Sequence, residues 1–359
     1  MNVLLIANDP GAFDVESAVR CRLRAYARAI GEVHVLSHAP SGALEAREVS
    51  EVCEDTLHLY PTHAPRPLRI LALAWRARAI VRAEGIEVIS AQDPFEHGLV
   101  AWWAARGTKA RLHIQLHTDP FAPDFANVGH PMSYINLARL FIMPFVLRRA
   151  ARIRAVSFKL KRHIVGRFGI SPECVSVLPI YTDLARFRAV THTPKKGQLL
   201  WVGRLEREKD PMLALEALAA ARAAGVDARL TMLGAGRLRG ALATRAKVRG
   251  LEPCIDFPGH RDPLPYLARA ELLLATSRYE GYGLAIVEAL AAGVPVLATD
   301  VGIAREAGAI VVQREHYIQK TVELLKGGLP VPPPVADPYP SFDGYVACYV
   351  ADIKATGGA

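Results

Sequence analysis

The sequence has few of the features that mark a metal-stapled or disulfide-bonded protein. Its 359 residues include five cysteines and no C-x-x-C pair; the cysteines are Cys21, Cys53, Cys174, Cys254 and Cys348. Such an odd, scattered set predicts neither a zinc site nor a disulfide framework. It is typical of a protein that lives in a reducing cytoplasm.

Long apolar runs are also missing. A bilayer-spanning helix needs an apolar run of about 18 residues or more, and the nearest run, 137–147, contains Arg139 and Pro144. The first residues, MNVLLIAND, enter a strand-like segment without a basic stretch and apolar core, so no signal peptide is expected. We therefore expect a cytoplasmic protein, either free or peripheral on the inner face of the membrane.

Acidic residues are few relative to basic ones in the first half of the chain. The net charge is +9, and residues 1–190 hold 24 Lys and Arg against 17 Asp and Glu. Two basic stretches stand out, 66–83 and 148–167, and the second has no acidic residue. They fit either a solvated basic face or attraction to an anionic membrane surface or polyanionic acceptor. Aromatic residues are sparse among them, so no nucleic acid is expected as a partner.

Short apolar, β-branched segments alternate with longer segments of helical periodicity along the chain. Segment 211–225 begins with proline and ends with glycine, as helices often do. Alternation of this kind predicts parallel sheets with helices on both faces. The predicted strands are 3–7, 33–37, 56–60, 87–91, 112–117, 153–157, 175–179, 198–203, 229–234, 254–259, 272–276, 294–299 and 309–313.

So many strands rarely share one open sheet, so the predicted fold is α/β with two doubly wound, Rossmann-like domains. The seam falls near the polar segment 187–197. This predicts an N-terminal domain at 1–188 and a C-terminal domain at 189–328. Residues 329–359 begin with a proline-rich, extended linker and end in a segment that predicts one more helix.

Segment 277–300 places two glutamates beside glycines and an apolar run. Glu280 precedes a turn, and Glu288 lies within the sequence LAIVEALAAGVPVLA. A buried carboxylate is costly unless it has a polar partner. If a strand leads through the turn into a helix, the first backbone amides of that helix form an anion site, and Glu288 can hold a diol. These amides belong to Gly281, Tyr282, Gly283 and Leu284. A generic turn with solvated glutamates is the alternative.

A second segment, 201–210, supplies cations. Gly203 and Arg204 follow a predicted strand, and Lys209 precedes the helix that starts at Pro211. Two cations at a strand end can neutralise a diphosphate, although solvated surface cations would look the same in sequence. No D-x-D occurs in the chain. A metal-bridged diphosphate therefore lacks its usual ligands, and we expect neither a metal nor a cofactor.

Together these segments resemble family 4 of the glycosyltransferases, which are retaining enzymes of the GT-B fold. RYEGYGLAIVEALAAGVPVLATDVG carries an E-x7-E motif at Glu280 and Glu288, and VGRLEREKD carries an Arg-x4-Lys pair at Arg204 and Lys209. The resemblance is strong over 197–313 and weaker upstream. It implies two Rossmann-like domains facing a central cleft. It also implies sugar transfer from a nucleotide-diphosphate sugar to a glycan or lipid-linked acceptor.

The resemblance also implies residue roles. Arg204 and Lys209 would hold the donor diphosphate, helped by the amides at the helix start, while Glu288 would bind the ribose and Glu280 would face the sugar. The implied catalytic residues are Glu280, His117, Arg204 and Lys209. The implied donor-binding residues are Gly11, Gly203, Arg204, Lys209, Gly234, His260, Gly281, Tyr282, Gly283, Leu284 and Glu288.

The sequence departs from the family pattern in several loops, among them PIYTD at 179–183, which lacks the usual Asn-Gly, and this keeps other interpretations open. The first loop has the single Gly11 where the family often has two adjacent glycines, and Ile303 stands where a second glycine is common. One alternative is a catalytically degenerate nucleotide-sugar-binding protein, and another is a GT-B enzyme such as a sugar-nucleotide epimerase. An α-glucan phosphorylase would need a pyridoxal-phosphate lysine and a much longer chain. The C-terminal segment 341–354 is expected to form a closing helix that packs back on the first domain. No oligomeric state is predicted.

Overall fold

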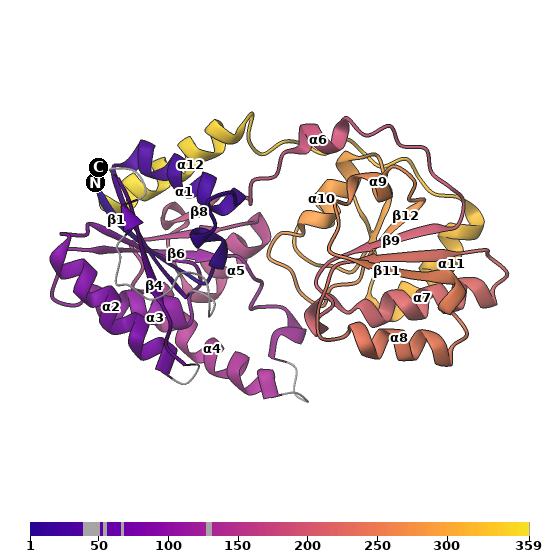
Figure 1. Cartoon of the computed structure of the whole chain (residues 1–359), viewed down its shortest axis with the longest axis horizontal. Helices are drawn as coiled ribbons and strands as arrows, with labels where there is room; N and C mark the ends of the chain where they lie inside the picture. The colour runs from indigo at the N-terminus through magenta and orange to yellow at the C-terminus, as the bar shows by residue number, and fades with distance from the viewer. Residues whose placement is uncertain (39–50, 53–55, 66–67, 127–130, 359) are drawn as a thin grey trace. The chain divides into compact units, whose positions relative to one another are not determined.

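The computed structural model describes residues 1–38, 51–52, 56–65, 68–126 and 131–358, with backbone only at 51–52 and 131–133. The chain forms two compact units (Figure 1). Unit 1 comprises Met1–Pro120, Ala126–Pro179 and Tyr339–Ala359, and unit 2 comprises Phe121–Phe125 and Ile180–Pro338. Cys53 and the first two residues of the basic stretch 66–83 lie outside the described residues. The four described cysteines are free.

The described part of unit 1 is built on an eight-stranded sheet of order β3-β4-β2-β1-β5-β6-β7-β8. Every neighbouring pair is parallel except β3–β4, which is antiparallel. The strands are β1 Asn2–Ala7, β2 Glu32–His38, β3 Glu51–Val52, β4 Leu57–Thr62, β5 Val88–Ala91, β6 Arg111–Leu116, β7 Arg152–Ala155 and β8 Val175–Val177. Most of their residues are fully buried, because both faces of the sheet are covered by helices.

Helices cover the two faces of this sheet in different groups (Figure 1). Helices α2, α3 and α4 lie next to one another on one face, and α1 and α12 pack together on the other. The helices of the unit are η1 Pro10–Phe13, α1 Ala18–Ile30, α2 Arg69–Ala83, α3 Glu96–Ala105, α4 Pro131–Leu147, α5 Phe158–Phe168, η4 Pro172–Cys174 and α12 Phe342–Gly357. The short η3, Pro123–Ala126, falls where the chain passes from the unit 2 segment Phe121–Phe125 back to unit 1.

The C-terminal helix α12 belongs to the core of unit 1. Ser341 caps its first turn through a hydrogen bond from the Gly344 amide, and the left-handed Gly358 follows its last residue. The Tyr349 ring stacks on Tyr26 of α1 at 4.2 Å, and the Tyr26 and Tyr345 hydroxyls are 2.7 Å apart. Helices α1 and α12 therefore cover the same face of the unit 1 sheet together.

The described part of unit 2 holds a six-stranded, all-parallel sheet of order β11-β10-β9-β12-β13-β14. Its strands are β9 Gln198–Val202, β10 Arg229–Leu233, β11 Ile255–Gly259, β12 Leu272–Ala275, β13 Val296–Ala298 and β14 Ile310–Val311. Its helices are α6 Leu184–Arg188, η5 Arg207–Lys209, α7 Pro211–Ala223, α8 Arg239–Val248, η6 Glu252–Cys254, α9 Leu264–Leu267, α10 Leu284–Ala291, η7 Arg314–His316 and α11 Tyr317–Gly327.

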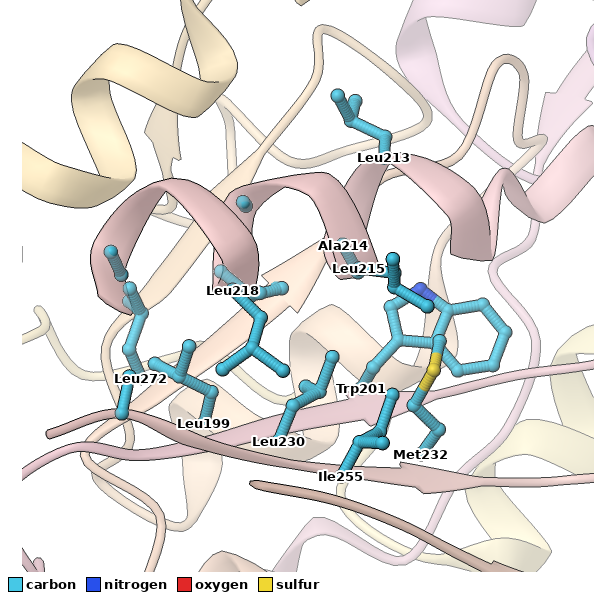
Figure 2. Close-up of a cluster of buried hydrophobic side chains, with 14 of the residues drawn as sticks. Leu199, Trp201, Leu213, Ala214, Leu215, Leu218, Leu230, Met232, Ile255 and Leu272 are labelled. Atoms are coloured by element: carbon cyan, nitrogen blue, oxygen red, sulfur yellow. The ribbon is translucent and has the colours of Figure 1, made fainter. Parts of the chain in front are cut away.

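One core cluster of unit 2 fixes the position of the central strand β9. Leu199 and Trp201 of β9 lie under Leu215 and Leu218 of α7, and neighbouring strands add further aliphatic side chains (Figure 2). Trp201 is only 2% exposed, and its indole Nε1 donates to Thr276 Oγ1 at 2.9 Å. The indole thus buries a large apolar area while its polar atom keeps a partner just beyond β12.

The predicted α/β fold with two doubly wound sheets is confirmed, and each of the thirteen predicted strands overlaps an observed one. The two-residue strand β3 was not predicted. Helix α4 continues through Pro144 to Leu147, so this proline does not end it. In the described part of the chain, no helix is both long and apolar enough to cross a membrane.

Candidate active site

Three glycines bring the loops after β9, β10 and β11 together in unit 2. The Gly203 amide donates to Leu233 O at 3.0 Å, and the Gly234 amide donates to Gly259 O at 2.8 Å. A Cβ atom on Gly234 would lie 1.9 Å from Gly203 O, and the φ of Gly234 is +131°. Only glycine allows both this close approach and this backbone conformation. The carboxyl ends of three neighbouring strands thus present backbone with little side-chain bulk.

The segments around Lys209 and Glu280 are tied to each other. Thr276 Oγ1 donates to Lys209 O at 2.9 Å, and the Arg278 amide donates to Glu208 O at 2.7 Å. Lys209 Nζ forms an ion pair with Glu280 Oε1. Residues 71 positions apart in sequence therefore meet at one edge of the sheet, beyond β9 and β12.

The same oxygen of Glu280 also accepts a hydrogen bond from Ser277 Oγ at 2.8 Å. The side chains of Lys209 and Glu280 are 21% and 17% exposed, so both reach solvent. A positive amine and a fixed carboxylate thus stand next to each other at an accessible point. A phosphate can be attracted by the first and a hydroxyl by the second.

Arg204 is a more exposed cation than Lys209. Its side chain is 72% exposed, and its Nη2 atom lies 2.8 Å from Glu208 Oε1. An exposed ion pair of this kind contributes little stability and is easily exchanged for another anion. The guanidinium can therefore leave Glu208 and pair with an incoming anionic ligand with little loss of free energy.

The turn between β12 and α10 leads into the first backbone amides of that helix. Gly283 precedes α10 with φ +105°, in the left-handed region that favours glycine. The preceding Tyr282 is buried, and its carbonyl accepts from the Ile303 amide at 2.9 Å. Burial and the nearby Asp337 carboxylate raise the pKa of Tyr282 to about 12, so it stays a neutral phenol. The first amides of α10 are donors for an anion.

Glu288 lies one turn further along α10 and is half-buried. Burial raises the pKa of its carboxyl above the ordinary value, while the Arg186 guanidinium and a hydrogen bond from the Thr182 hydroxyl oppose the shift. Asp262 adds a smaller upward contribution, although it forms its own ion pair with Arg186. Thr182 was not predicted to contact Glu288. The side chains are far apart in sequence, and no motif links them.

Asp210, a buried aspartate next to Lys209, was also not predicted from the sequence as part of this region. Asp210, 5% exposed, caps the start of α7 in a left-handed conformation with φ +46°. Its carboxylate forms ion pairs with Arg278 and Arg314. The sequence R-E-K-D-P could have predicted these ion pairs, because an aspartate that is buried before a helix-starting proline needs cationic partners.

Two of the predicted site residues, Gly11 and His117, belong to unit 1. Gly11 lies in η1 after β1, and its amide donates to Asp9 Oδ1 at 3.2 Å. An added Cβ would approach Val19 Cγ2 to 3.1 Å. The buried Arg20 donates to Ala12 O at 2.6 Å and braces the same loop. The loop is therefore rigidly held by its own unit.

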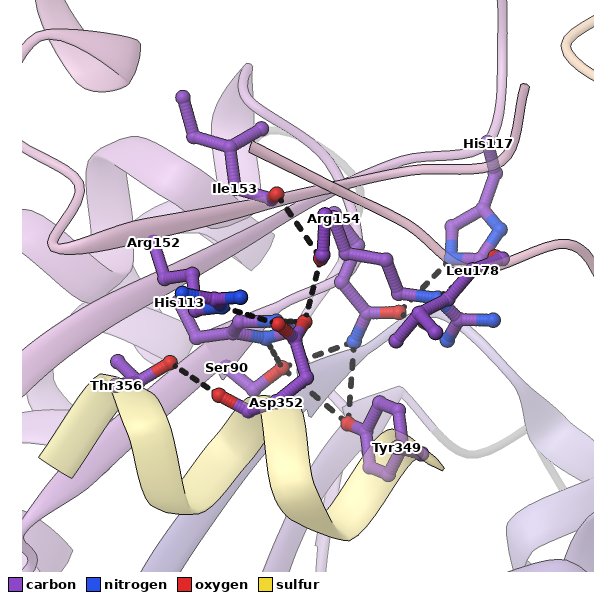
Figure 3. A network of polar contacts seen from close by, with 12 residues as sticks. Ser90, His113, His117, Arg152, Ile153, Arg154, Leu178, Tyr349, Asp352 and Thr356 are labelled. Carbon is purple, nitrogen blue, oxygen red and sulfur yellow. Dashed lines mark hydrogen bonds and ion pairs between the residues drawn. The ribbon is translucent and has the colours of Figure 1, made fainter. Parts of the chain in front are cut away.

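His117 follows β6 and belongs to a network that reaches α12 (Figure 3). Gln115 Nε2 donates to Ser90 Oγ at 2.9 Å and to Tyr349 OH at 3.3 Å. Its Oε1 atom is therefore the acceptor, and it receives Arg154 Nη1 at 3.1 Å and His117 Nε2 at 3.0 Å. This assigns the proton of the neutral imidazole to Nε2 and leaves Nδ1 as an acceptor.

The charge state of His117 follows from the same surroundings. Burial, followed by the positive charges of Arg154 and Arg22, lowers the pKa of His117 to about 3. The imidazole is thus neutral at any physiological pH. It can accept a hydrogen bond from a hydroxyl but does not supply a proton as an imidazolium.

The far end of this network holds a buried carboxylate. His113 Nδ1 lies 2.8 Å from Ser90 Oγ, and His113 Nε2 lies 2.9 Å from Asp352 Oδ2. Asp352 also pairs with Arg152 and accepts from Ser176 Oγ at 2.8 Å. Although burial opposes it, these partners hold the pKa of Asp352 below its ordinary value. Helix α12 is thereby pinned to β6, β7 and β8.

The structure gathers most predicted site residues in unit 2. Arg204, Lys209, Glu280 and the turn before α10 occupy loops that follow β9 and β12, and Glu288 lies on α10 itself. Gly203 and Gly234 lie in the touching loops, and His260 is exposed in the loop after β11. Gly281, Tyr282 and Gly283 are buried, and Leu284 is half-buried.

Within the described residues, one cluster of side chains has the chemistry of metal ligands, and it lies in unit 1. Glu32, His34 and His58 meet on β2 and β4. His58 Nε2 is 2.6 Å from Glu32 Oε2, and His34 Nδ1 is 3.0 Å from Tyr60 OH. The two imidazole planes are stacked at 13°, which disfavours in-plane coordination of one ion by both rings.

Both halves of the chain match models of one group of enzymes. Residues 15–186 match the family described as Glycosyltransferase Family 4, and residues 196–327 match the family described as Glycosyl transferases group 1. The two matches together cover most of the chain and follow its division into two units.

Two curated relatives and one solved structure illustrate these similarities. Glycogen synthase of Mycobacterium tuberculosis is 29% identical over 269 residues, which span 61% of this chain and 64% of that protein. The GDP-mannose-dependent alpha-(1-6)-phosphatidylinositol dimannoside mannosyltransferase of M. tuberculosis is 41% identical over 117 residues. These residues span 32% of this chain and 30% of that protein. The sucrose-phosphate synthase of Thermosynechococcus elongatus has the same fold, with a TM-score of 0.70 at 18% identity, covering 99% of this chain and 96% of that one.

Proposed function

Because the chain belongs to family 4 of the glycosyltransferases and has their GT-B fold, we propose that it transfers a sugar from a nucleotide-diphosphate sugar with retention of the anomeric configuration. The observation that carries this proposal is the meeting of Lys209 with Glu280. It joins the two motif segments into one site with a cation for phosphate and a carboxylate for sugar.

The departing nucleoside diphosphate is the group that most needs stabilisation. Lys209 and Arg204 supply positive charge to its phosphate oxygens, and the first amides of α10 supply hydrogen bonds. Lys209 is held by Glu280 before the donor arrives, so its amine is already positioned. Removing one such prearranged group typically costs on the order of 3 kcal/mol of transition-state stabilisation, about a hundredfold in rate.

Glu288 recognises the nucleotide half of the donor. Its carboxylate offers two acceptor oxygens to the two hydroxyls of a ribose, and it sits one helical turn after the phosphate-binding amides. Burial raises its pKa, so the carboxyl of the empty protein takes up a proton at a higher pH than an ordinary glutamate does. A ribose diol favours the ionised form, and donor binding should therefore weaken as the pH falls toward that pKa.

His117 of unit 1 is a neutral hydrogen-bond acceptor. Its Nε2 atom donates to Gln115, so its Nδ1 atom can accept from a substrate hydroxyl. The low pKa excludes a role as a charged acid. The diphosphate itself serves as the acceptor of the proton that the incoming hydroxyl loses.

The acceptor is a glycan or a lipid-linked sugar at the inner face of a membrane, and the protein works in the cytoplasm. The excess of basic over acidic residues in 1–190 supports this assignment, because anionic lipid attracts such a surface. One relative carries a phosphatidylinositol dimannoside in its name, which is an acceptor of this type. Neither a metal nor a cofactor takes part in the proposed reaction.

A thermal-shift screen of UDP-, GDP- and ADP-sugars tests the donor site. A donor at a hundred times its dissociation constant adds roughly 2.7 kcal/mol to the free energy of unfolding. Glu288→Ala and Arg204→Ala should each remove most of that shift. Glu323→Ala and Arg245→Ala, on the surface helices α11 and α8, are the matched controls and should keep it. No stabilisation by any nucleotide sugar would contradict the proposal.

Retention and turnover need a separate measurement. Proton NMR of the glycoside formed from an α-linked donor should show an α linkage. A donor that binds but is never consumed would instead identify a degenerate, nucleotide-sugar-binding protein.

A further inference from the structure

Unit 1 leaves several large apolar side chains exposed on α2 and α4. Leu71 and Trp75 of α2 are 58% and 69% exposed, and they lie one helical turn apart. Tyr134 and Phe141 of α4 are 71% and 78% exposed and occupy one side of that helix. Single exposed apolar residues are common, whereas a group of this size on neighbouring helices marks an interaction surface.

Ring contacts join these helices into one surface. Trp75 of α2 meets Trp103 of α3 edge to face, with centroids 5.5 Å apart. Trp102 of α3 meets Phe145 of α4 in the same way at 4.8 Å. Figure 1 shows α2, α3 and α4 side by side on one face of the sheet. We call the outer side of these three helices the α2–α4 surface.

Arginines are layered on the aromatic rings of this surface. The guanidinium carbon of Arg78 lies 5.0 Å from the Trp103 ring centre, and that of Arg149 lies 3.7 Å from the Phe145 ring centre. Arg106 covers Trp102 at 5.2 Å. These contacts fix the cations at the level of the rings. The earlier expectation that aromatics are sparse among the basic residues holds along the sequence but not in space.

Negative charge is nearly missing from the same helices. The only acidic residue in the sequences of α2, α3 and α4 is Glu96, and it is paired with Arg139 at 2.8 Å. Arg82 and Arg148 are exposed near the C-terminal ends of α2 and α4. The α2–α4 surface therefore combines exposed apolar side chains with an excess of positive charge, and the exposed Glu84 that follows α2 is the acidic residue next to Arg82.

We propose that the α2–α4 surface docks on an anionic lipid bilayer. Tryptophan and arginine are suited to the boundary between headgroups and acyl chains, because each has an apolar body and a polar edge. Leu71 and Phe141 enter the acyl region, while Arg82 and Arg148 bind lipid phosphates. The inference builds on the proposed lipid-linked acceptor, and it names the part of the molecule that meets the membrane.

Charge decides between a bilayer and a second copy of this chain as the occupant. Two copies meeting through the α2–α4 surface would bring the same arginines face to face, and like charges oppose such a contact. An anionic bilayer attracts every one of them at once. A soluble acidic glycan would satisfy the arginines but would leave Trp75 and Phe141 in water.

Vesicle flotation of the full chain tests the proposal. Phosphatidylcholine vesicles with and without phosphatidylglycerol are used at low and at high salt, in the absence of any nucleotide sugar. The wild type should float with phosphatidylglycerol vesicles at low salt and dissociate at high salt, because screening weakens attraction to the surface.

Two double variants separate the charged and apolar contributions. Arg82→Glu with Arg148→Glu should lower partitioning at least about tenfold, and Trp75→Ser with Phe141→Ser should lower it to a similar extent. The control is Lys247→Glu with Val248→Ser, an exposed cation and apolar pair on α8 of unit 2, which should bind like the wild type. All variants are first checked for an unchanged melting temperature.

Failure of the wild type to bind phosphatidylglycerol vesicles would overturn the proposal, as would equal binding of the charge-reversed variant. A wild-type dimer that either α2–α4 variant converts to a monomer would show that the surface joins two copies, and would also overturn it. Donor binding is measured separately by thermal shift. A protein that binds donor but not vesicles therefore refutes the membrane surface without refuting the transferase.

Discussion

The ion pair between Lys209 and Glu280 is the residue-level feature on which the proposed chemistry depends. It lies at an accessible edge, and Ser277 holds the carboxylate from the other side. The pair keeps each partner oriented before any ligand is present, which reduces the entropy lost on binding. Measurements of turnover should therefore report its role better than measurements of the free energy of unfolding, because partly exposed ion pairs stabilise a fold only weakly.

Replacing Lys209 with methionine should strongly reduce turnover. Lys209→Met keeps the length of the side chain but removes the positive charge next to the leaving diphosphate, so kcat/KM should fall about a hundredfold. The matched control is Lys326→Met on the exposed side of α11, which should leave kcat/KM within about twofold of the wild type. Equal kinetics for the two variants would mean that Lys209 takes no part in the reaction.

A single methyl group at Gly234 should destabilise unit 2. Gly234→Ala forces a Cβ against Gly203 O and requires the strained φ of +131°. The free energy of unfolding should fall by about 2 kcal/mol or more, measured by urea denaturation. Gly240→Ala is the control, because its site on α8 has open space and helical backbone, and it should stabilise by about 0.5–1 kcal/mol. A smaller loss at Gly234 than about 0.5 kcal/mol would show that the loops can separate freely.

At the level of secondary-structure elements, α12 shows how a C-terminal segment supports a predicted site residue in another part of the sequence. Asp352 on this helix anchors His113, and Tyr349 contacts the same glutamine that orients His117 (Figure 3). Helix α12 thus acts on His117 through buried hydrogen bonds rather than by touching a ligand. The arrangement makes Gln115 and Arg154 positioning residues for the imidazole.

Asp352→Asn should destabilise the protein in a pH-dependent manner. The folded chain holds the pKa of Asp352 below its ordinary value of 3.8. Its contribution is therefore fully present above that ordinary value and is lost as the pH falls through the lower, folded pKa. At neutral pH the loss in unfolding free energy should be about 3 kcal/mol, the typical cost of removing one partner of a buried ion pair.

Urea denaturation of both proteins between neutral pH and about pH 3 measures this dependence. The difference between wild type and Asp352→Asn should shrink as the pH falls below the ordinary aspartate value. Asp343→Asn, an exposed aspartate in the first turn of α12, should cost less than about 1 kcal/mol. A difference that is independent of pH would mean that the charge of Asp352 is not what anchors the helix.

Across the whole molecule, the elements of the fold were more predictable than the contacts among them. Buried parallel strands are short apolar runs, so a strand at a segment such as 272–276 can be predicted from its composition alone. Strand β3 was missed because Glu51–Val52 is only two residues long and pairs at the sheet edge. The motif residues were predicted from the resemblance to family 4, and the structure places Arg204, Lys209 and Glu280 in the loops that follow β9 and β12.

The remaining contacts depend on residues that are distant in sequence. The hydrogen bond from Thr182 to Glu288, and the ion pairs of Asp210 with Arg278 and Arg314, join segments that no local pattern connects. The α2–α4 surface is a similar case. Its tryptophans lie on different helices, and only packing on the sheet brings the rings together.

The central claim is that unit 2 binds a nucleotide-diphosphate sugar through Glu288 and its neighbours. Isothermal titration calorimetry with the best donor from the thermal-shift screen tests it most directly. The wild type and the Glu323→Gln control should bind one donor per chain with the same affinity. Glu288→Gln should bind at least about tenfold more weakly, since a charge-assisted hydrogen bond is replaced by a neutral one. Equal affinities for all three proteins, or no binding at millimolar donor, would contradict the account.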